Sequence, residues 1–119
     1  MNDDRKKLYE ELYKDYLEQL PEKLSTIENY YTEFEQSKSE KSYNNLVRII
    51  HSIKGSGGSY GHHFLTSLCN LWELKLNDWS QFNDHYQEIL DLSIKGLELM
   101  RKYKTDPSSC SDSLLVGFE

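Results

Sequence analysis

Apolar side chains recur every three or four residues along most of this chain, and that spacing places them on one face of a helix. No segment sustains the alternation of apolar and polar residues that a half-buried strand requires. The sequence therefore predicts an all-α protein. The first apolar series, spaced by four, consists of Leu8, Leu12, Tyr16 and Leu20.

Proline, glycine and polar turn residues divide this pattern into five predicted helices. Pro21 is expected to begin the second helix, because proline in a first turn lacks only an N–H that has no partner there. Ser39 is the predicted N-cap of the third helix, and Gly61 is predicted to end this helix or to bend the chain. The five helices are expected to run up to residue 20, from 21 to the turn at 36–40, and over 40–60, 62–76 and 82–103.

Short connections between helices favour antiparallel neighbours, so the predicted fold is an up-and-down antiparallel four-helix bundle with an additional N-terminal helix. A chain of 119 residues suits one domain. Residues 1–104 are assigned to the bundle, and the Ser- and Asp-rich residues 105–119 to a flexible tail. The predicted core face of the last helix consists of Tyr86, Ile89, Leu90, Ile94, Leu97 and Met100.

Charge and hydropathy exclude several classes of function. The formal net charge of −6 argues against nucleic acid as a partner, because phosphate backbones select basic surfaces. No apolar run approaches the roughly 18 residues that a membrane span needs, and the first residues lack the apolar stretch of a signal peptide. We therefore expect a cytoplasmic monomer that meets other proteins, with Cys69 and Cys110 as reduced thiols.

The most informative segment is HSIKGSGGSYG, which runs from His51 to Gly61. Its glycines suggest a phosphate-binding loop, but the Gly-Lys-Ser/Thr ending of a P-loop is missing and no strand precedes the segment. Inside a helix, glycines at positions 55, 57 and 58 cost about 1 kcal/mol each relative to alanine. That cost indicates a surface that must stay free of side chains, although close helix packing would also explain Gly57.

A helical wheel places His51 on the solvent side of the third helix. At about 100° per residue, it lies roughly 140° from the centre of the apolar face, so its ring is expected to point outwards. The apolar face is formed by Leu46, Ile50, Ile53 and Gly57. The residues on the His51 side of the helix are Lys54, Gly55 and Gly58, with Asn44 and Arg48 at its border.

This arrangement suits phosphoryl transfer. A histidine with a pKa near 6.5 is largely neutral at pH 7, so a ring nitrogen of His51 can attack an acyl phosphate on a partner's aspartate. Lys54 can offset the charge of the phosphoryl oxygens, and the glycines allow a partner's loops to approach. No metal cage is evident nearby, so the chain is expected to need no cofactor of its own, and Mg²⁺ is expected on the partner's carboxylates.

The motif HSIKG, followed by Gly58 and Gly61, resembles the histidine-containing phosphotransfer (HPt) domain, whose usual pattern is a histidine, two residues and then Lys-Gly. The resemblance continues through Leu65, Leu68, Cys69 and Glu73 of the next helix. It implies that His51 is phosphorylated, that Lys54 supports the phosphate, and that Gly55 and Gly58 clear a docking surface. It also implies partners that are receiver domains of response regulators or hybrid histidine kinases.

The sequence thus predicts a phosphocarrier in a two-component phosphorelay that passes a phosphoryl group between receiver aspartates through His51. It is not expected to be a kinase, because no nucleotide-binding motif is present. The alternative is a helical adaptor that binds a receiver or a histidine kinase without carrying phosphate, and its weakness is that an adaptor has no need of the nucleophile. A metal site formed by His62, His63 and Cys69 is disfavoured, because adjacent histidines point in different directions on a helix.

Overall fold

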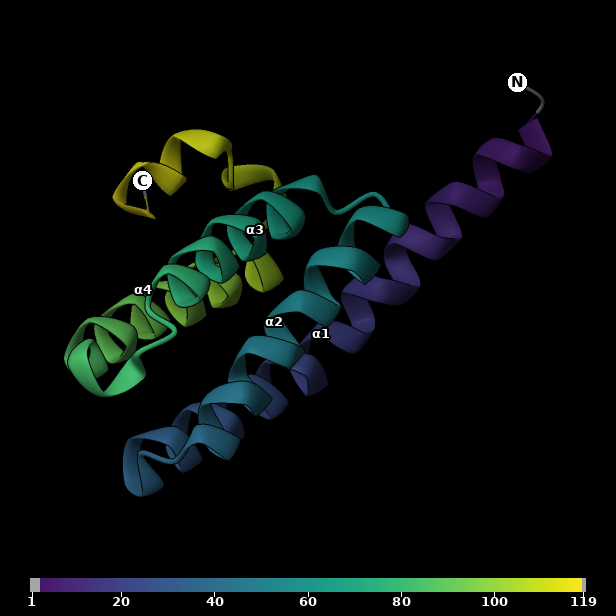
Figure 1. The fold of residues 1–119 in the computed structure, drawn as a ribbon. Coiled ribbons are helices and arrows are strands. Elements are labelled where there is room, and N and C mark those ends of the chain that lie inside the picture. Colours follow the sequence, from purple (N-terminus) through teal and green to yellow (C-terminus); the bar gives the residue numbers. More distant parts are fainter. Residues whose placement is uncertain (1–2, 119) are drawn as a thin grey trace.

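The computed structural model describes residues 3–118, and this part of the chain is helical with short connections (Figure 1). Its long helices are α1 (Asp3–Ser37), α2 (Glu40–Ser59), α3 (His63–Asp78) and α4 (Tyr86–Thr105). Short 3₁₀ helices lie between α3 and α4, at η1 (Phe82–Asp84), and after α4, at η2 (Pro107–Ser109) and η3 (Asp112–Phe118). The predicted all-α class is confirmed, and the outermost predicted positions, 1–2 and 119, lie outside the described residues.

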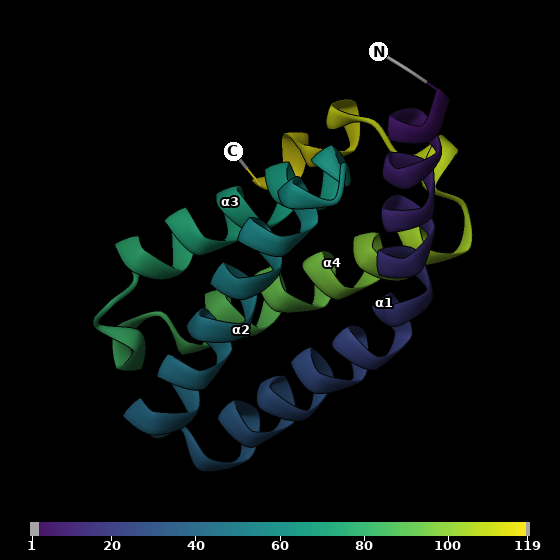
Figure 2. The same ribbon diagram turned by 90° about the vertical axis from the view of Figure 1, so that its right-hand side faces the viewer.

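The long helices form a bundle in which each packs against two others. Both α1 and α3 contact α2 and α4, so the helices follow one another around a common core (Figures 1 and 2). The fully buried side chains come from all four, and include Leu20, Phe34, Leu46, Leu68, Trp72 and Ile89. The predicted helical bundle is therefore confirmed.

The boundary predicted at Pro21 is wrong, because α1 runs through this residue as one continuous helix. Leu20 and Leu24 are buried on either side of it, so core packing holds both halves in one helix. Pro21 itself is exposed, which leaves room for its ring. Proline removes one backbone hydrogen bond and typically bends a helix, and Figure 2 shows α1 changing direction partway along its length.

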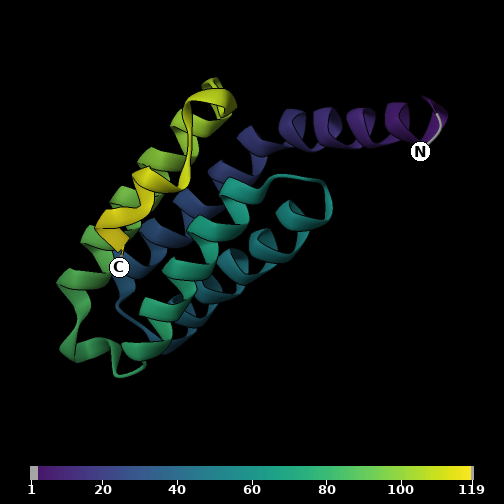
Figure 3. The ribbon, with the colours of Figure 1, turned by 90° about the horizontal axis from the view of Figure 1, so that it is seen from above.

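The N-terminal part of α1 extends beyond the rest of the bundle (Figure 3). The 35 residues of α1 correspond to about 52 Å of helix, against about 30 Å for the 20 residues of α2. The buried residues of α1 begin only at Tyr16, whereas Leu8 and Tyr9 are exposed. We call residues 3–12 the α1 extension.

Local capping fixes both ends of α2, the helix that carries the motif. The Ser39 side chain accepts a hydrogen bond from the backbone N–H of Ser42, and the Ser42 hydroxyl in turn accepts from the backbone of Ser39. At the other end Gly61 has a φ of +87°, in the left-handed region that favours glycine. The predicted N-cap and the predicted glycine end are both confirmed.

Two predictions about the C-terminal third differ from the structure. Residues 105–118 are not loose, because Leu115 and Phe118 of η3 are buried and η3 packs against α3. On α4, Ile94 is exposed rather than in the core, since it lies about 120° from the centre of the buried face. That centre is occupied by the small residues Ser93 and Gly96, which a search for large apolar side chains overlooks.

A buried histidine connects the start of α3 to both α1 and α4. His62 is 0% exposed, with Nε2 at 2.9 Å from the carbonyl oxygen of Tyr13 and Nδ1 at 2.5 Å from the hydroxyl of Tyr103. A carbonyl only accepts, so Nε2 carries the hydrogen and Nδ1 accepts from Tyr103. The ring also stacks on Tyr13, with centroids 3.9 Å apart. His62 therefore anchors α1 just below its extension.

Burial lowers the pKa of His62 below its usual value, and this predicts a pH-dependent stability. As pH falls through 6.5, the unfolded chain binds a proton at this position before the folded chain does, so the free energy of unfolding decreases. In urea denaturation between pH 8 and pH 5, the free energy of unfolding is expected to fall more steeply with decreasing pH for the wild-type chain than for His62→Phe. The variant is expected to be less stable at pH 8, because Tyr103 loses its acceptor. Identical slopes would show that His62 does not contribute.

Candidate functional site

His51 lies on the exposed side of α2, as the helical wheel predicts. Its side chain is 67% exposed, while Ile50 and Ile53 on either side of it are buried in the core. The core-facing positions of α2 thus fix the direction of the imidazole. Residues 44, 48, 51, 55 and 58 follow one another at intervals of three or four and share one helical face.

The structure adds Glu73 of α3 to the predicted site. One carboxylate oxygen, Oε2, lies 2.6 Å from His51 Nδ1, and the other, Oε1, lies 2.5 Å from Lys54 Nζ. The Glu73 side chain is only 12% exposed, in contrast to the His51 side chain, which is 67% exposed. Glu73 therefore joins the two residues of the motif, which the sequence predicts to be near one another but not to share a partner.

The hydrogen bonds to Glu73 determine which form each group takes. Partial burial by itself raises the pKa of the Glu73 carboxyl, but the hydrogen bonds from Lys54 and His51 outweigh it and leave the pKa lowered. The group is therefore a carboxylate, which can only accept, so Nδ1 of His51 carries the hydrogen. In the neutral ring the free lone pair then belongs to Nε2, the nitrogen on the far side of the ring from Glu73.

Lys54 is partly buried and forms an ion pair rather than extending into solvent. Its side chain is 26% exposed, and the pair with Glu73 holds its ammonium group beside the imidazole. An ammonium group has three donors, so contact with one carboxylate oxygen leaves it able to donate to another anion. The geometry thus places a positive charge near the imidazole of His51, and the ammonium group of Lys54 keeps donors for a further contact.

The two glycines predicted to clear the surface have different environments. A Cβ atom built at Gly55 would have nothing within 4 Å, so this position is open. A Cβ at Gly58 would lie 2.9 Å from Oγ1 of Thr66, which donates a hydrogen bond to the carbonyl of Lys54. Close packing between α2 and α3 is therefore a sufficient reason for glycine at position 58, and only Gly55 is left bare by the fold.

Asn44 and Arg48 are exposed on the same face of α2, about two turns and one turn before His51, respectively. Their predicted part in docking is compatible with that position and stays a prediction. The disfavoured metal site has two of its three members buried, since His62 and Cys69 are 0% exposed. Among residues 3–118, no group of three or more His, Cys, Asp or Glu side chains is arranged to hold a metal ion.

The sequence contains one signal that could have singled out Glu73. It is the only acidic residue between Gly61 and Asn77, in a helix that is otherwise largely apolar. A lone carboxylate at the edge of an apolar helical face usually has a partner. Its pairing with His51 and Lys54, however, depends on the contact between α2 and α3, which the sequence pattern alone does not specify.

Comparison with known proteins identifies a family for this chain. No curated protein and no solved structure matches the chain. In the described residues, no helix is both long enough and apolar enough to cross a membrane. The model of the Hpt domain family matches residues 11–100, which include His51, Lys54 and Glu73. The chain therefore belongs to the Hpt domain family, whose members have a histidine phosphotransfer role in phosphorelays.

Proposed function

We propose that this chain is a phosphocarrier that accepts a phosphoryl group on His51 from the aspartate of one receiver domain and passes it to the aspartate of another. The observation that carries the proposal is the shared contact of Glu73 with His51 and Lys54, which combines an exposed nucleophile, a cation and an orienting carboxylate. The proposal assigns no kinase activity to the chain, because the sequence contains no nucleotide-binding motif.

Transfer of the phosphoryl group to His51 needs no external acid or base. The lone pair of His51 Nε2 attacks phosphorus, a P–N bond forms, and the P–O bond to the receiver aspartate breaks, so the aspartate leaves as a carboxylate. The ring becomes cationic, because Nδ1 keeps its hydrogen, and Glu73 stabilises that charge at a distance of 2.6 Å. The reverse step uses the same groups, so a second receiver can take the phosphoryl group.

Lys54 is assigned to the phosphoryl oxygens in this scheme. Its ammonium group lies next to the ring, where it can offset the charge on the transferring group while remaining near Glu73. The Mg²⁺ ion that phosphoryl transfer commonly uses would be bound by the carboxylates of the receiver. Glu73 is then a positioning residue, because it acts on the phosphoryl group only through His51 and Lys54.

The proposal is tested by incubating the chain with a receiver domain that carries labelled phosphate on its aspartate. Transfer is expected to give a labelled chain whose phosphate is stable to base and lost in acid, as the P–N bond of phosphohistidine requires. Adding a second, unphosphorylated receiver with Mg²⁺ is expected to remove the label. A chain that binds receivers but never acquires label would instead be the adaptor.

Replacing Lys54 by alanine is expected to slow transfer about tenfold or more, because a charge-assisted contact to the phosphoryl group is worth about 1.5–3 kcal/mol. The fold should be retained, since the Lys54 side chain is not part of the core. The matched control is Lys41→Ala, which removes an exposed lysine near the other end of α2. Stopped-flow transfer rates and circular dichroism check both statements, and equal rates for the two variants would remove Lys54 from the mechanism.

A further inference from the structure

Thr66 of α3 directs its hydroxyl to a different helix rather than to its own. The hydroxyl donates to the backbone carbonyl of Lys54 in α2, at 3.0 Å. Thr26 and Thr105 instead donate to the carbonyl four residues earlier in their own helices, at 3.1 Å in both cases. That local bond is the common choice of a threonine inside a helix. The half-buried Thr66 side chain thus forms a polar link between α3 and α2.

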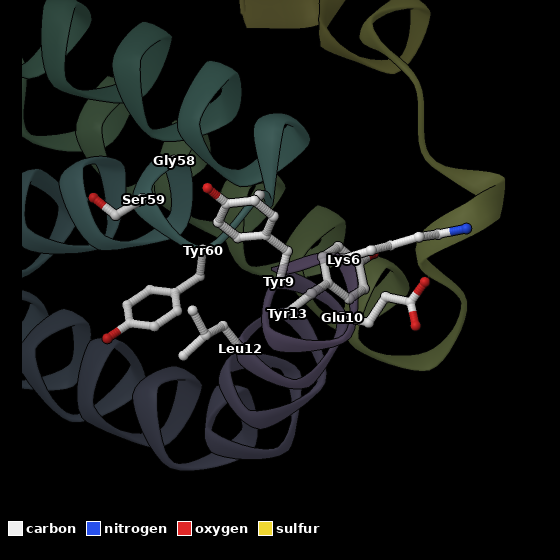
Figure 4. A pocket seen from close by; sticks show the side chains of 9 residues that line it. Lys6, Tyr9, Glu10, Leu12, Tyr13, Gly58, Ser59 and Tyr60 are labelled. Carbon is white, nitrogen blue, oxygen red and sulfur yellow. The ribbon is translucent and has the colours of Figure 1, made fainter. Parts of the chain in front are cut away.

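Gly58 makes room for this link. A Cβ atom at position 58 would lie 2.9 Å from Oγ1 of Thr66 and 3.7 Å from its Cγ2, so a side chain there would displace the hydroxyl. Figure 4 shows Gly58 next to Ser59 and Tyr60 at the end of α2. Glycine weakens a helix, and at this position the weaker helix is offset by a close contact with α3.

The register that places Thr66 against Gly58 also places Glu73 against His51. His51 comes seven residues before Gly58 on α2, and Glu73 comes seven residues after Thr66 on α3. Seven residues make two turns, or about 10.5 Å with a rotation of only about 20°, so each pair shares one face of its helix. The two helices run in opposite directions (Figure 1). A shift of α3 along α2 at Thr66 therefore moves Glu73 relative to His51 by a similar amount.

The contacts of Glu73 tolerate little movement. Its two carboxylate oxygens have different partners, Nδ1 of His51 at 2.6 Å and Nζ of Lys54 at 2.5 Å. Hydrogen bonds of this kind are formed up to about 3.2 Å, so a shift of about 1 Å is enough to break one of them. Because Thr66 holds the carbonyl of Lys54 while Glu73 holds its ammonium group, α3 contacts this lysine at both ends.

We propose that Thr66 is a positioning residue for phosphoryl transfer: its hydroxyl fixes the register of α3 on α2, and that register keeps the Glu73 carboxylate against His51. The inference rests on the proposed function for its effect on transfer, and it adds to that function a residue two turns away from Glu73. Because the bond to Glu73 determines which ring nitrogen of His51 carries the hydrogen, Thr66 acts on the nucleophile through the tautomer of the imidazole.

The first test reads this tautomer directly and needs no receiver domain. Thr66→Val keeps the shape of threonine but cannot donate, and its methyl group cannot approach the Lys54 carbonyl closer than about 3.3 Å. Nitrogen-15 NMR of the His51 imidazole at alkaline pH is expected to show mainly the form with hydrogen on Nδ1 in the wild-type chain. In Thr66→Val the fraction with hydrogen on Nε2 is expected to rise about twofold or more.

Two matched variants separate the hydroxyl of Thr66 from a general effect on helix stability. Thr66→Ser keeps the donor and is expected to keep the wild-type tautomer. Thr26→Val removes a hydroxyl-to-carbonyl bond of similar length within α1, away from the α2–α3 contact, and is expected to leave the tautomer unchanged.

The second test measures the initial rate of labelling by a phosphorylated receiver. Thr66→Val is expected to slow labelling about tenfold, because a small misplacement of groups around a nucleophile has a large effect on rate. Thr66→Ser is expected to restore the rate to within about twofold of wild type. In a Glu73→Ala background, Thr66→Val is expected to change the rate by less than about twofold, because the group through which Thr66 acts is then missing.

Other results would overturn the inference. An unchanged tautomer in Thr66→Val, or a Thr66→Ser rate as low as that of Thr66→Val, would show that the hydroxyl does not position the site. An equal effect of Thr66→Val with and without Glu73 would show that the two residues act independently. A wild-type chain that never acquires label would remove the proposed function, and the tautomer in the same variants would still decide whether Thr66 positions Glu73.

Discussion

Replacement of His51 by glutamine is expected to abolish labelling of the chain by a phosphorylated receiver, with a loss of at least a hundredfold. The amide nitrogen of glutamine has no free lone pair for attack on phosphorus, whereas Nε2 of the imidazole has one. No neighbouring side chain can replace it, because Glu73 accepts hydrogen bonds at its carboxylate and Lys54 is held as an ammonium ion. The measurement is the amount of acid-labile label after gel separation.

The fold is expected to survive this change, because the His51 side chain is 67% exposed and its hydrogen bond in the structure is to Glu73. Thermal unfolding should therefore give a midpoint close to that of wild type. His63→Gln is the matched control, since His63 is also exposed but lies at the start of α3. Persistent label on the His51 variant, or equal loss in the control, would assign the phosphate to another residue.

Replacement of Gly96 by alanine is expected to cost about 2 kcal/mol of folding free energy. A Cβ at this position would lie 2.6 Å from Cε3 and 2.7 Å from Cη2 of the Trp72 ring. Trp72 is 0% exposed, so its ring cannot move aside without disturbing the core between α3 and α4. Overpacking of this kind destabilises the fold by about 1–3 kcal/mol. The better helix propensity of alanine offsets less than about 1 kcal/mol of that loss.

Thermal unfolding checks this value, with an expected decrease of about 8 °C at roughly 4 °C per kcal/mol for a domain of this size. The matched control is Gly55→Ala on α2, where nothing lies within 4 Å of the new methyl group. That variant is expected to be more stable than wild type by about 0.5–1 kcal/mol, because alanine favours the helix. A destabilised control, or an unchanged Gly96 variant, would contradict the packing shown around Trp72.

The sequence pattern predicts those features that depend on one helix at a time. The exposure of His51, its separation from Ile50 and Ile53, and the cap at Ser39 all follow from the 3.6-residue period and from local hydrogen bonding. The same reasoning fails at Pro21, because a local rule for helix starts competes with core packing on both sides of the proline.

Features that depend on two helices could not be predicted in this way. The partnership of Glu73 with His51 and Lys54 joins residues 22 and 19 positions apart. His62, weighed in the sequence as a metal ligand, is a buried hydrogen-bonding residue because Tyr13 and Tyr103 approach it from α1 and α4. Gly58 also gains its packing role only from Thr66 on the next helix. Tertiary contacts, rather than helical period, determine these three positions.

The exposure of the α1 extension has a consequence for how such chains diversify. Residues such as Lys6, Tyr9 and Glu10 lie outside the buried core, so substitutions there should change stability by no more than about 0.5 kcal/mol. After gene duplication, a copy could therefore alter this segment freely while the His51 region stayed intact.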